Sequence, residues 1–149
     1  MLSILLDSNI ILDVMITRLP FLEMSAKVIG VVKLKKVEGY VSASAITDIY
    51  YITRRELKDK KTTLNLIKDI LTFVKIATVS EKEINSALAL EWSDFEDAVQ
   101  YSTALLNDMD YIITRNGNDF KSSEIPAITP EDFCKLLETE ETDKDDDCK

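Results

Sequence analysis

The sequence of 149 residues contains no histidine, and this absence excludes several kinds of catalytic site at once. Without histidine the chain has no Ser-His-Asp triad, no Cys-His pair and no histidine-based zinc site. Any chemistry must therefore rest on carboxylates, amides, hydroxyls, lysines and arginines. Clustered carboxylates suit hard cations such as Mg²⁺ or Mn²⁺.

Cysteines and long apolar runs are also scarce. Cys134 and Cys148 are not spaced as a metal knuckle or a redox pair, which fits a reduced, cytoplasmic chain. No apolar run approaches the roughly 18 residues of a membrane span, and no basic region precedes the short apolar run near Met1. We therefore expect one domain with neither a membrane segment nor a secretory signal.

Basic residues are fewer than acidic ones. The net charge is −9, and residues 138–149 hold −5 of it as seven acids and two lysines, which leaves −4 for the rest. That sign is wrong for general electrostatic binding to nucleic acid, but it does not exclude a nuclease whose acids are offset by bound metal. From Thr139 onward the only apolar residue is Cys148. We expect a folded domain over residues 1–138 and a disordered acidic tail over 139–149.

The chain does contain short apolar segments that alternate with helical patterns. Leu2, Ile4, Leu5 and Leu6 form an almost unbroken run before Asp7, as in a strand covered on both faces of a parallel sheet. Alternating strands and helices predict an α/β fold with a central parallel sheet of about five strands. The further strand candidates are 39–42, 74–79, 111–113 and 127–128, and the helical patterns cover 21–36, 44–58, 64–74, 81–91 and 94–106.

Acids and amides stand where these strands end and helices begin. Asp7 and Asn116 follow two strands, whereas Asp48 and Asp97 lie in the first turns of two helices. Because ligands collect outside the carboxyl ends of strands in an open α/β sheet, these side chains would meet in one crevice. Each acid alone has a simpler explanation as a helix cap or dipole partner.

Four motifs together, in their order and spacing, resemble the PIN domain, and in particular the bacterial PIN proteins related to VapC-type toxins. The motifs are Leu5-Leu6-Asp7-Ser8-Asn9, Asp48 in a Ser-x-x-x-Asp helix start, Asp94-Phe95-Glu96-Asp97-Ala98 and Thr114-Arg115-Asn116-x-x-Asp119-Phe120. The likeness covers about residues 1–137. It implies a three-layer α/β/α fold and hydrolysis of RNA phosphodiesters with Mg²⁺ or Mn²⁺.

The resemblance also implies a set of site residues. The family's acidic cluster carries over to Asp7, Asp48 and Asp97, with Asp7 and Asp97 as the principal metal ligands. Many members have a fourth acid where this chain has Asn116, so we expect Asp119 to supply the missing charge as a metal ligand while Asn116 orients a metal-bound water. Gly117 would permit the positive φ that so tight a loop needs.

Three further residues are candidates for supporting roles. Asn9 and Thr114 are placed to orient the acids. Arg115 either holds a phosphate by bidentate contact or is a surface arginine at the end of a strand. Converging carboxylates cannot all stay ionised without a counter-ion, and one or two Mg²⁺ ions would supply it.

Other classes fit less well. A phosphatase of the haloacid dehalogenase type needs a second aspartate where this chain has Asn9, and a receiver domain needs paired acids and a lysine that are absent. The remaining alternative is a PIN-fold protein that binds RNA or a partner with weak or no cleavage, which Asn116 and the acidic body favour. The basic stretch Arg54–Lys61 is either a solvated helix end or a phosphate-contacting patch.

The resemblance finally implies partners. It implies a homodimer and, for VapC-type relatives, a small antitoxin protein bound along helical grooves. Candidate exposed apolar residues for such contacts are Tyr50, Tyr51 and Phe73, which are equally compatible with the core.

Overall fold

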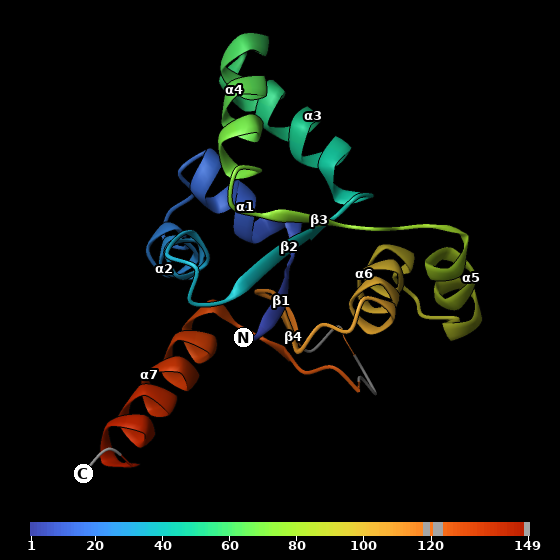
Figure 1. Cartoon of the computed structure of the whole chain (residues 1–149). Coiled ribbons are helices and arrows are strands. Elements are labelled where there is room, and N and C mark those ends of the chain that lie inside the picture. The colour runs from blue at the N-terminus through green and yellow to red at the C-terminus, as the bar shows by residue number, and fades with distance from the viewer. Residues whose placement is uncertain (118–119, 121–123, 148–149) are drawn as a thin grey trace.

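Strands and helices alternate along the whole chain (Figure 1). The computed structural model describes residues 1–117, 120 and 124–147. For residues 143–147 it describes the backbone alone. In chain order the elements are β1 (Ser3–Leu6), α1 (Ser8–Met15), α2 (Leu22–Lys33), β2 (Glu38–Ser42), α3 (Ala45–Leu57), α4 (Lys60–Ile70), β3 (Lys75–Ala77), α5 (Glu81–Leu90), α6 (Phe95–Leu106), β4 (Tyr111–Ile113), β5 (Ala127–Ile128) and α7 (Pro130–Asp147).

The strands form one parallel five-stranded sheet in the order β3-β2-β1-β4-β5. β1 lies at its centre, with Leu5 opposite Tyr40 of β2 and Leu6 opposite Ile113 of β4. The predicted α/β fold with a central parallel sheet of about five strands is thus confirmed. The unbroken apolar run of β1 is explained by its central place, because such a strand has no face in water.

Side chains of β1 point alternately into two hydrophobic cores. Ile4 and Leu6 belong to the core shared with α1, α2 and α7, and Leu5 belongs to the core shared with Tyr101 of α6. All three strand residues are fully buried. Figure 1 shows α1 and α2 on one side of the sheet and α5 and α6 on the other, and residues of α3 and α4 belong to the core of α1 and α2. The fold thus has three layers.

Two local features fix how helices meet the sheet. A Cβ on Gly39 of β2 would lie 2.7 Å from both methyl groups of Val32, so only glycine lets β2 approach α2 this closely. At the start of α6, the Asp94 carboxylate accepts a hydrogen bond of 3.1 Å from the N–H of Asp97, as the sequence predicts for an N-cap. This cap sets the first turn of α6, which carries Glu96 and Asp97.

Some helix ends differ from the prediction. Helix α2 ends at Lys33 rather than at residue 36, because Lys35 adopts a left-handed φ of 61° that an α-helix cannot continue. Ser44 directly precedes α3, all of which is described, but the Ser44 side chain makes no capping hydrogen bond to this helix. The Ser44 Oγ instead lies 3.2 Å from the Ser42 Oγ.

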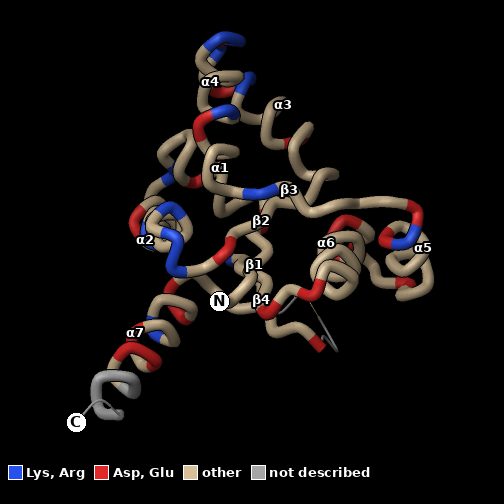
Figure 2. Tube along the Cα trace, in the orientation of Figure 1, with Lys and Arg blue, Asp and Glu red and all other residues tan. Residues whose placement is uncertain are grey.

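Helix α7 packs on α2 and continues into the acidic segment. Phe133 is fully buried, and Lys36 pairs with Glu141 at 3.6 Å. The structure gives helix up to Asp147, where the sequence predicts a disordered tail; Cys148 and Lys149 lie outside the described residues. Figure 2 shows the red acidic residues of α7 and the blue basic residues at the end of α3 and the start of α4 at opposite ends of the molecule. The boundary between a stable domain and a dispensable tail stays a prediction.

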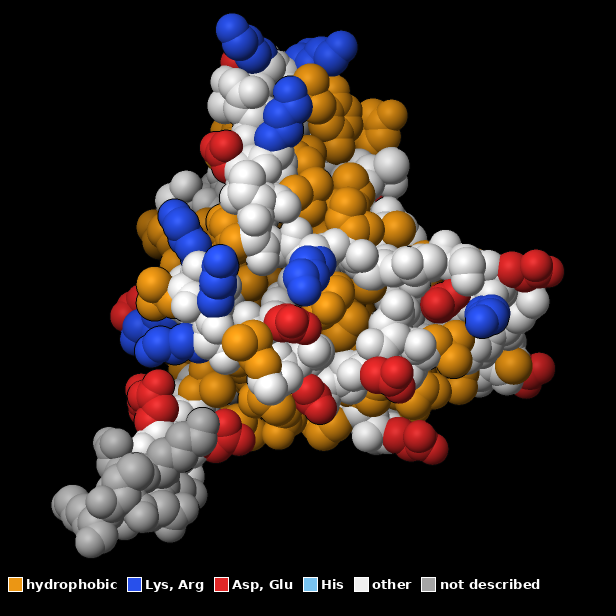
Figure 3. Space-filling model, in the orientation of Figure 1, with side chains coloured by type: hydrophobic (Ala, Val, Ile, Leu, Met, Phe, Trp, Pro, Cys, Tyr) orange, Lys and Arg blue, Asp and Glu red, His pale blue; other side chains and the backbone are white. Residues whose placement is uncertain are grey.

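The three apolar candidates for assembly differ in exposure. Tyr51 is 68% exposed, whereas Tyr50 and Phe73 are half-buried. Figure 3 shows hydrophobic side chains gathered on the surface over α3, where Tyr51 lies. In the part of the chain that the structure describes, no helix combines the length and apolar character needed to cross a membrane.

Candidate active site

Asp7 lies where β1 and β4 end together. Its backbone N–H donates to the carbonyl of Ile113 at 2.9 Å, which carries the pairing of the two strands one residue further. The Asp7 carboxylate makes no capping hydrogen bond to α1, all of which is described. The simpler explanation of Asp7 as a helix cap is therefore not supported.

Thr114 connects Asp7 to the end of β4. The Thr114 hydroxyl donates to Asp7 Oδ2 at 2.9 Å and accepts from the N–H of Asn116 at 3.2 Å. The Thr114 side chain is 1% exposed, so water does not compete for these bonds. Because Ser8 also donates to Asp7 Oδ1, at 3.4 Å, the carboxylate is oriented from two sides.

The acids of α3 and α6 act on one another across this edge. The pKa of Glu96 is raised by burial and then by the negative charges of Asp48, Asp7 and Asp94. The charge of Glu96, an exposed residue that the motif did not single out, therefore interacts with the acids at this edge. Asp97 is half-buried in the same helical turn. Adjacent acids in one turn look alike in sequence, and only the helix orientation reveals that Glu96 interacts with Asp7 and Asp48.

Asn116 is exposed beside the acids, and Gly117 follows it. The two residues line a hollow of about 420 Å³ with Arg115, Thr129 and Asp132. The prediction of a positive φ at Gly117 was wrong, since no described glycine has one. Glycine is needed because a Cβ would lie 2.8 Å from the Ala127 carbonyl oxygen. Asp119, the expected fourth acid, lies outside the described residues.

Arg115 and Asn9 are both engaged with groups other than the acids of the cluster. Arg115 Nη2 lies 3.4 Å from Asp13 Oδ1, and its guanidinium stacks 3.8 Å from the ring centre of Phe21. Asn9 Oδ1 accepts from Arg18 Nη1 at 3.2 Å. Asp13 was not predicted as a site residue, and nothing in the sequence near it identifies its arginine partners.

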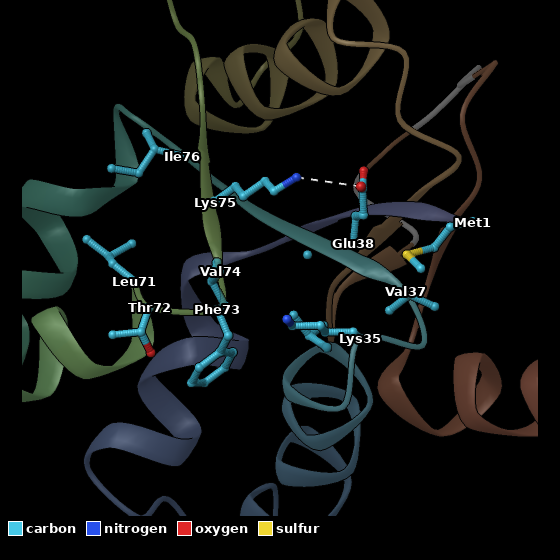
Figure 4. A pocket seen from close by; sticks show the side chains of 12 residues that line it. Met1, Lys35, Val37, Glu38, Leu71, Thr72, Phe73, Val74, Lys75 and Ile76 are labelled. Atoms are coloured by element: carbon cyan, nitrogen blue, oxygen red, sulfur yellow. Dashed lines mark ion pairs between the residues drawn. The ribbon is translucent and has the colours of Figure 1, made fainter.

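A larger hollow of about 600 Å³ lies at the opposite edge of the sheet, where β2 and β3 begin (Figure 4). It is mostly apolar, and its one carboxylate, Glu38, is paired with Lys75 at 3.5 Å. Despite its size it holds a single carboxylate rather than several acids. We therefore place the candidate site at the carboxyl edge, where the acids lie.

The donors at the carboxyl edge suit a hard cation in their chemistry. Among the described residues, no group of three or more acids or cysteines is close enough together to hold a metal ion as it stands. The oxygen-only donor set and the like-charge effect on Glu96 nevertheless fit a divalent cation, because such an ion would offset the crowded charge.

Fold and site together define an α/β domain with acids at the carboxyl edge of a parallel sheet. The sequence model of the PIN domain family matches residues 3–118, and the chain belongs to that family. The resemblance read from the sequence motifs is thereby confirmed.

Individual relatives share the fold over nearly their whole length. Ribonuclease VapC1 of Aquifex aeolicus (strain VF5) is 28% identical over 142 residues, which cover 92% of this chain and 96% of the relative. Two solved structures cover 86% of this chain and 98% of their own: a toxin-antitoxin complex from Klebsiella pneumoniae (TM-score 0.63, 22% identity) and VapBC2 from Rickettsia felis bound to a promoter DNA fragment (TM-score 0.66, 14% identity).

Proposed function

We propose that the protein is a metal-dependent endoribonuclease and the toxin of a toxin-antitoxin pair, acting in the cytoplasm. The observation that carries this proposal is the placement of Asp7, which Thr114 fixes at the sheet edge beside the like charges of Asp48 and Glu96. Membership in the PIN family and the likeness to a protein named ribonuclease VapC1 support it.

The acids would hold the cation, Mg²⁺ or Mn²⁺. Asp7, Asp48 and Asp97 are the proposed ligands from the family pattern, and Glu96 adds charge to the same edge. A bound divalent cation would lower the pKa of a water and offset charge on the phosphodiester. Thr114 keeps the Asp7 carboxylate in one orientation by donating to Oδ2.

Asn116 and Asp119 would complete the site. An amide coordinates or orients water through its carbonyl oxygen without adding charge, so the charge must come from elsewhere. We assign it to Asp119, and we assign to Asn116 the orientation of the attacking water. Arg115 is bound to Asp13 and Phe21, so we assign it a role in placement rather than in holding a phosphate.

Cleavage of RNA by the purified protein, with Mn²⁺ or with EDTA, tests this function. Asp7→Asn and Asp97→Asn should abolish Mn²⁺-dependent cleavage. Their metal-free melting temperatures should not fall, and we expect a rise, because each change removes a like charge from a crowded edge. Asp69→Asn, which removes an exposed carboxylate of α4, is the control. Near wild-type cleavage by Asp7→Asn or Asp97→Asn would remove that residue from the ligand set.

The second candidate is a PIN-fold protein that binds RNA or a partner with little or no cleavage. The exposed amide of Asn116 at the position of a family acid favours it. Binding of RNA without cleavage in either Mg²⁺ or Mn²⁺ would support this candidate over the first.

A protein partner and self-association belong to the same proposal. The exposed Tyr51, which stacks edge-on against Tyr50 at 5.1 Å, gives α3 an apolar surface for an antitoxin or a second copy. Sedimentation of the isolated protein at micromolar concentration should show a dimer. A monomer alone would count against the homodimer but not against an antitoxin.

A further inference from the structure

A buried ionic cluster lies directly beside the acidic edge. Asp13 of α1 is 0% exposed and accepts a hydrogen bond of 2.9 Å from the Ser25 hydroxyl of α2. Its Oδ1 lies 3.4 Å from Arg115 Nη2 and 4.0 Å from Arg18 Nη1. We call Asp13, Arg18, Ser25 and Arg115 the Asp13 cluster.

Both arginines of the Asp13 cluster reach the segments that carry the site. Arg18 Nη1 donates to Asn9, which lies two residues beyond Asp7. Arg115 comes directly after Thr114, whose hydroxyl holds Asp7. One buried carboxylate therefore holds two guanidinium groups, one next to the end of β1 and one next to the end of β4.

The Asp13 cluster is poorly built as a stabilising device. Among the described residues, Asp13 Oδ1 and Arg115 Nε are buried and have no hydrogen-bond partner. Burial raises the pKa of Asp13, and Ser25, Arg115 and Arg18 only oppose that effect. Replacing a buried ion cluster by apolar residues is often neutral or stabilising. We therefore explain the Asp13 cluster by its placement of the two arginines rather than by a contribution to stability.

Arg115 is held on a second side by Phe21, whose ring centre lies 3.8 Å from the guanidinium. The guanidinium is thereby kept on the α1–α2 side of the loop. Two sources of negative charge lie near a guanidinium released from Asp13: Asp7, which the adjacent Thr114 contacts, and Asp132, which lines the same hollow as Arg115. An Arg115–Asp7 pair would occupy the carboxylate that the proposed cation needs.

We propose that Asp13 is a positioning residue: it holds Arg18 and Arg115 so that the ends of β1 and β4 stay in register and Arg115 does not pair with Asp7. This role rests on the proposed nuclease function. It predicts that loss of Asp13 acts on the acidic edge through Arg115, and that removing Arg115 as well partly undoes the damage.

The test compares Asp13→Asn, Ser25→Ala, Arg115→Gln and the double variant Asp13→Asn/Arg115→Gln. Asp13→Asn should weaken Mn²⁺ binding, measured by calorimetry, by about 10- to 100-fold, as for other residues that orient metal ligands. The double variant should bind Mn²⁺ more tightly than Asp13→Asn. Ser25→Ala, which keeps both arginine contacts, should have a smaller effect and serves as the variant that folds if Asp13→Asn does not.

A second measurement does not depend on metal or on RNA. Amide resonances of Asn9, Thr114 and Asn116 should shift in Asp13→Asn and return toward wild type in the double variant, while those of α5 stay unchanged. Ser25→Ala should shift the same resonances by less. Wild-type Mn²⁺ affinity with unmoved resonances in Asp13→Asn would overturn the proposal, as would a double variant no better than Asp13→Asn.

The two proposals fail in different ways. If the wild-type protein neither binds Mn²⁺ nor cleaves RNA, the proposed function is wrong, and the resonances of Asn9 and Thr114 alone decide the role of Asp13. If the wild-type protein binds and cleaves while Asp13→Asn does so equally well, only the role of Asp13 is wrong.

Discussion

Thr114 is the residue whose side chain most directly sets the position of Asp7. Thr114→Val removes the hydroxyl and keeps the shape of the side chain. We expect a loss of about 1 kcal/mol in unfolding free energy from the missing hydrogen bond and a loss of about 10-fold or more in Mn²⁺ affinity and RNA cleavage.

Thr103→Val is the matched control for Thr114→Val. Thr103 is equally buried, and its hydroxyl donates within α6 to the Val99 carbonyl at 2.7 Å. Both variants remove one buried hydroxyl, but only one of these hydroxyls contacts the acidic edge. Equal RNA cleavage by the two variants would show that the orientation of Asp7 does not depend on Thr114.

We propose that Asp119 supplies charge to the metal site while Asn116 orients a metal-bound water. Asp119→Asn should weaken Mg²⁺ binding more than Asn116→Ala does, because only the first change removes a charge. Asn116→Asp should strengthen Mg²⁺ binding. Magnesium titrations of the three purified variants check this order. If Asp119→Asn binds Mg²⁺ as the wild type does, the site depends on the other carboxylates.

Sequence reasoning located some site residues and missed others for a physical reason. Asp7 and Asn116 follow apolar strands, so the end of the strand pattern marks them. Asp13 and Glu96 lie inside helices, where the sequence does not distinguish an acid that interacts with distant parts of the chain from one that faces only solvent. Their roles depend on Arg115 and Asp7, which other parts of the chain deliver.

Among the elements, α5 has the most complete start. The Ser80 hydroxyl accepts from the backbone N–H of Glu83 while the Glu83 carboxylate accepts from the Ser80 N–H at 2.9 Å, which forms a capping box. The Ser80 hydroxyl also donates to the Glu83 carboxylate. These bonds hold the pKa of Glu83 below its usual value. Ser80→Ala should therefore cost about 1 kcal/mol of unfolding free energy, measured by urea denaturation at pH 7.

The charge of Glu83 adds a dependence on pH. A carboxyl whose pKa is lowered by folding stabilises the protein fully above its unfolded value of about 4.3, and that contribution disappears as the pH falls through the lower folded value. Glu83→Gln should thus be less stable than wild type at pH 7 and equal to it in strong acid. Glu81→Gln, which removes an exposed carboxylate from the same helical turn, is the control. A stability difference that persists unchanged at low pH would show that the charge is not involved.

The sequence predicts the existence of elements better than their ends. Apolar runs located all five strands, because a buried strand consists mainly of apolar residues. The early end of α2 depends on the left-handed conformation of Lys35, a residue with no special preference for it. Likewise, the sequence offers Ser42 or Ser44 as the cap of α3, but α3 has no side-chain capping bond and the two hydroxyls approach each other instead.

For the whole molecule, the acidic end of α7 should be dispensable. Residues 139–142 are exposed, and the ion pair of Glu141 with Lys36 lies at the surface, where such pairs contribute about 0–1 kcal/mol. Deleting residues 139–149 should leave the melting temperature nearly unchanged. Phe133→Ala, which empties a fully buried position of the same helix, should cost about 3–5 kcal/mol. A large loss from the deletion would show that the segment docks.

The fold class and the number of strands could be predicted from the alternation of strand and helix patterns alone. The helical structure of the C-terminal segment could not. Charge density from Thr139 onward predicts disorder, yet α7 continues to Asp147. The helix has a start that sequence can encode, with the Thr129 hydroxyl accepting from the N–H of Asp132 at 3.1 Å. Its end has no comparable marker.

The central place of β1 has a consequence for the timing of synthesis. Asp7 is made early, but the hydroxyl that orients it belongs to a residue 107 positions later. A chain still on the ribosome cannot assemble the acidic edge until β4 has left the exit tunnel and inserted beside β1. The order of strands therefore imposes a delay: a growing chain contains Asp7 long before Thr114 can orient it, and a product truncated before Tyr111 lacks both β4 and that hydroxyl.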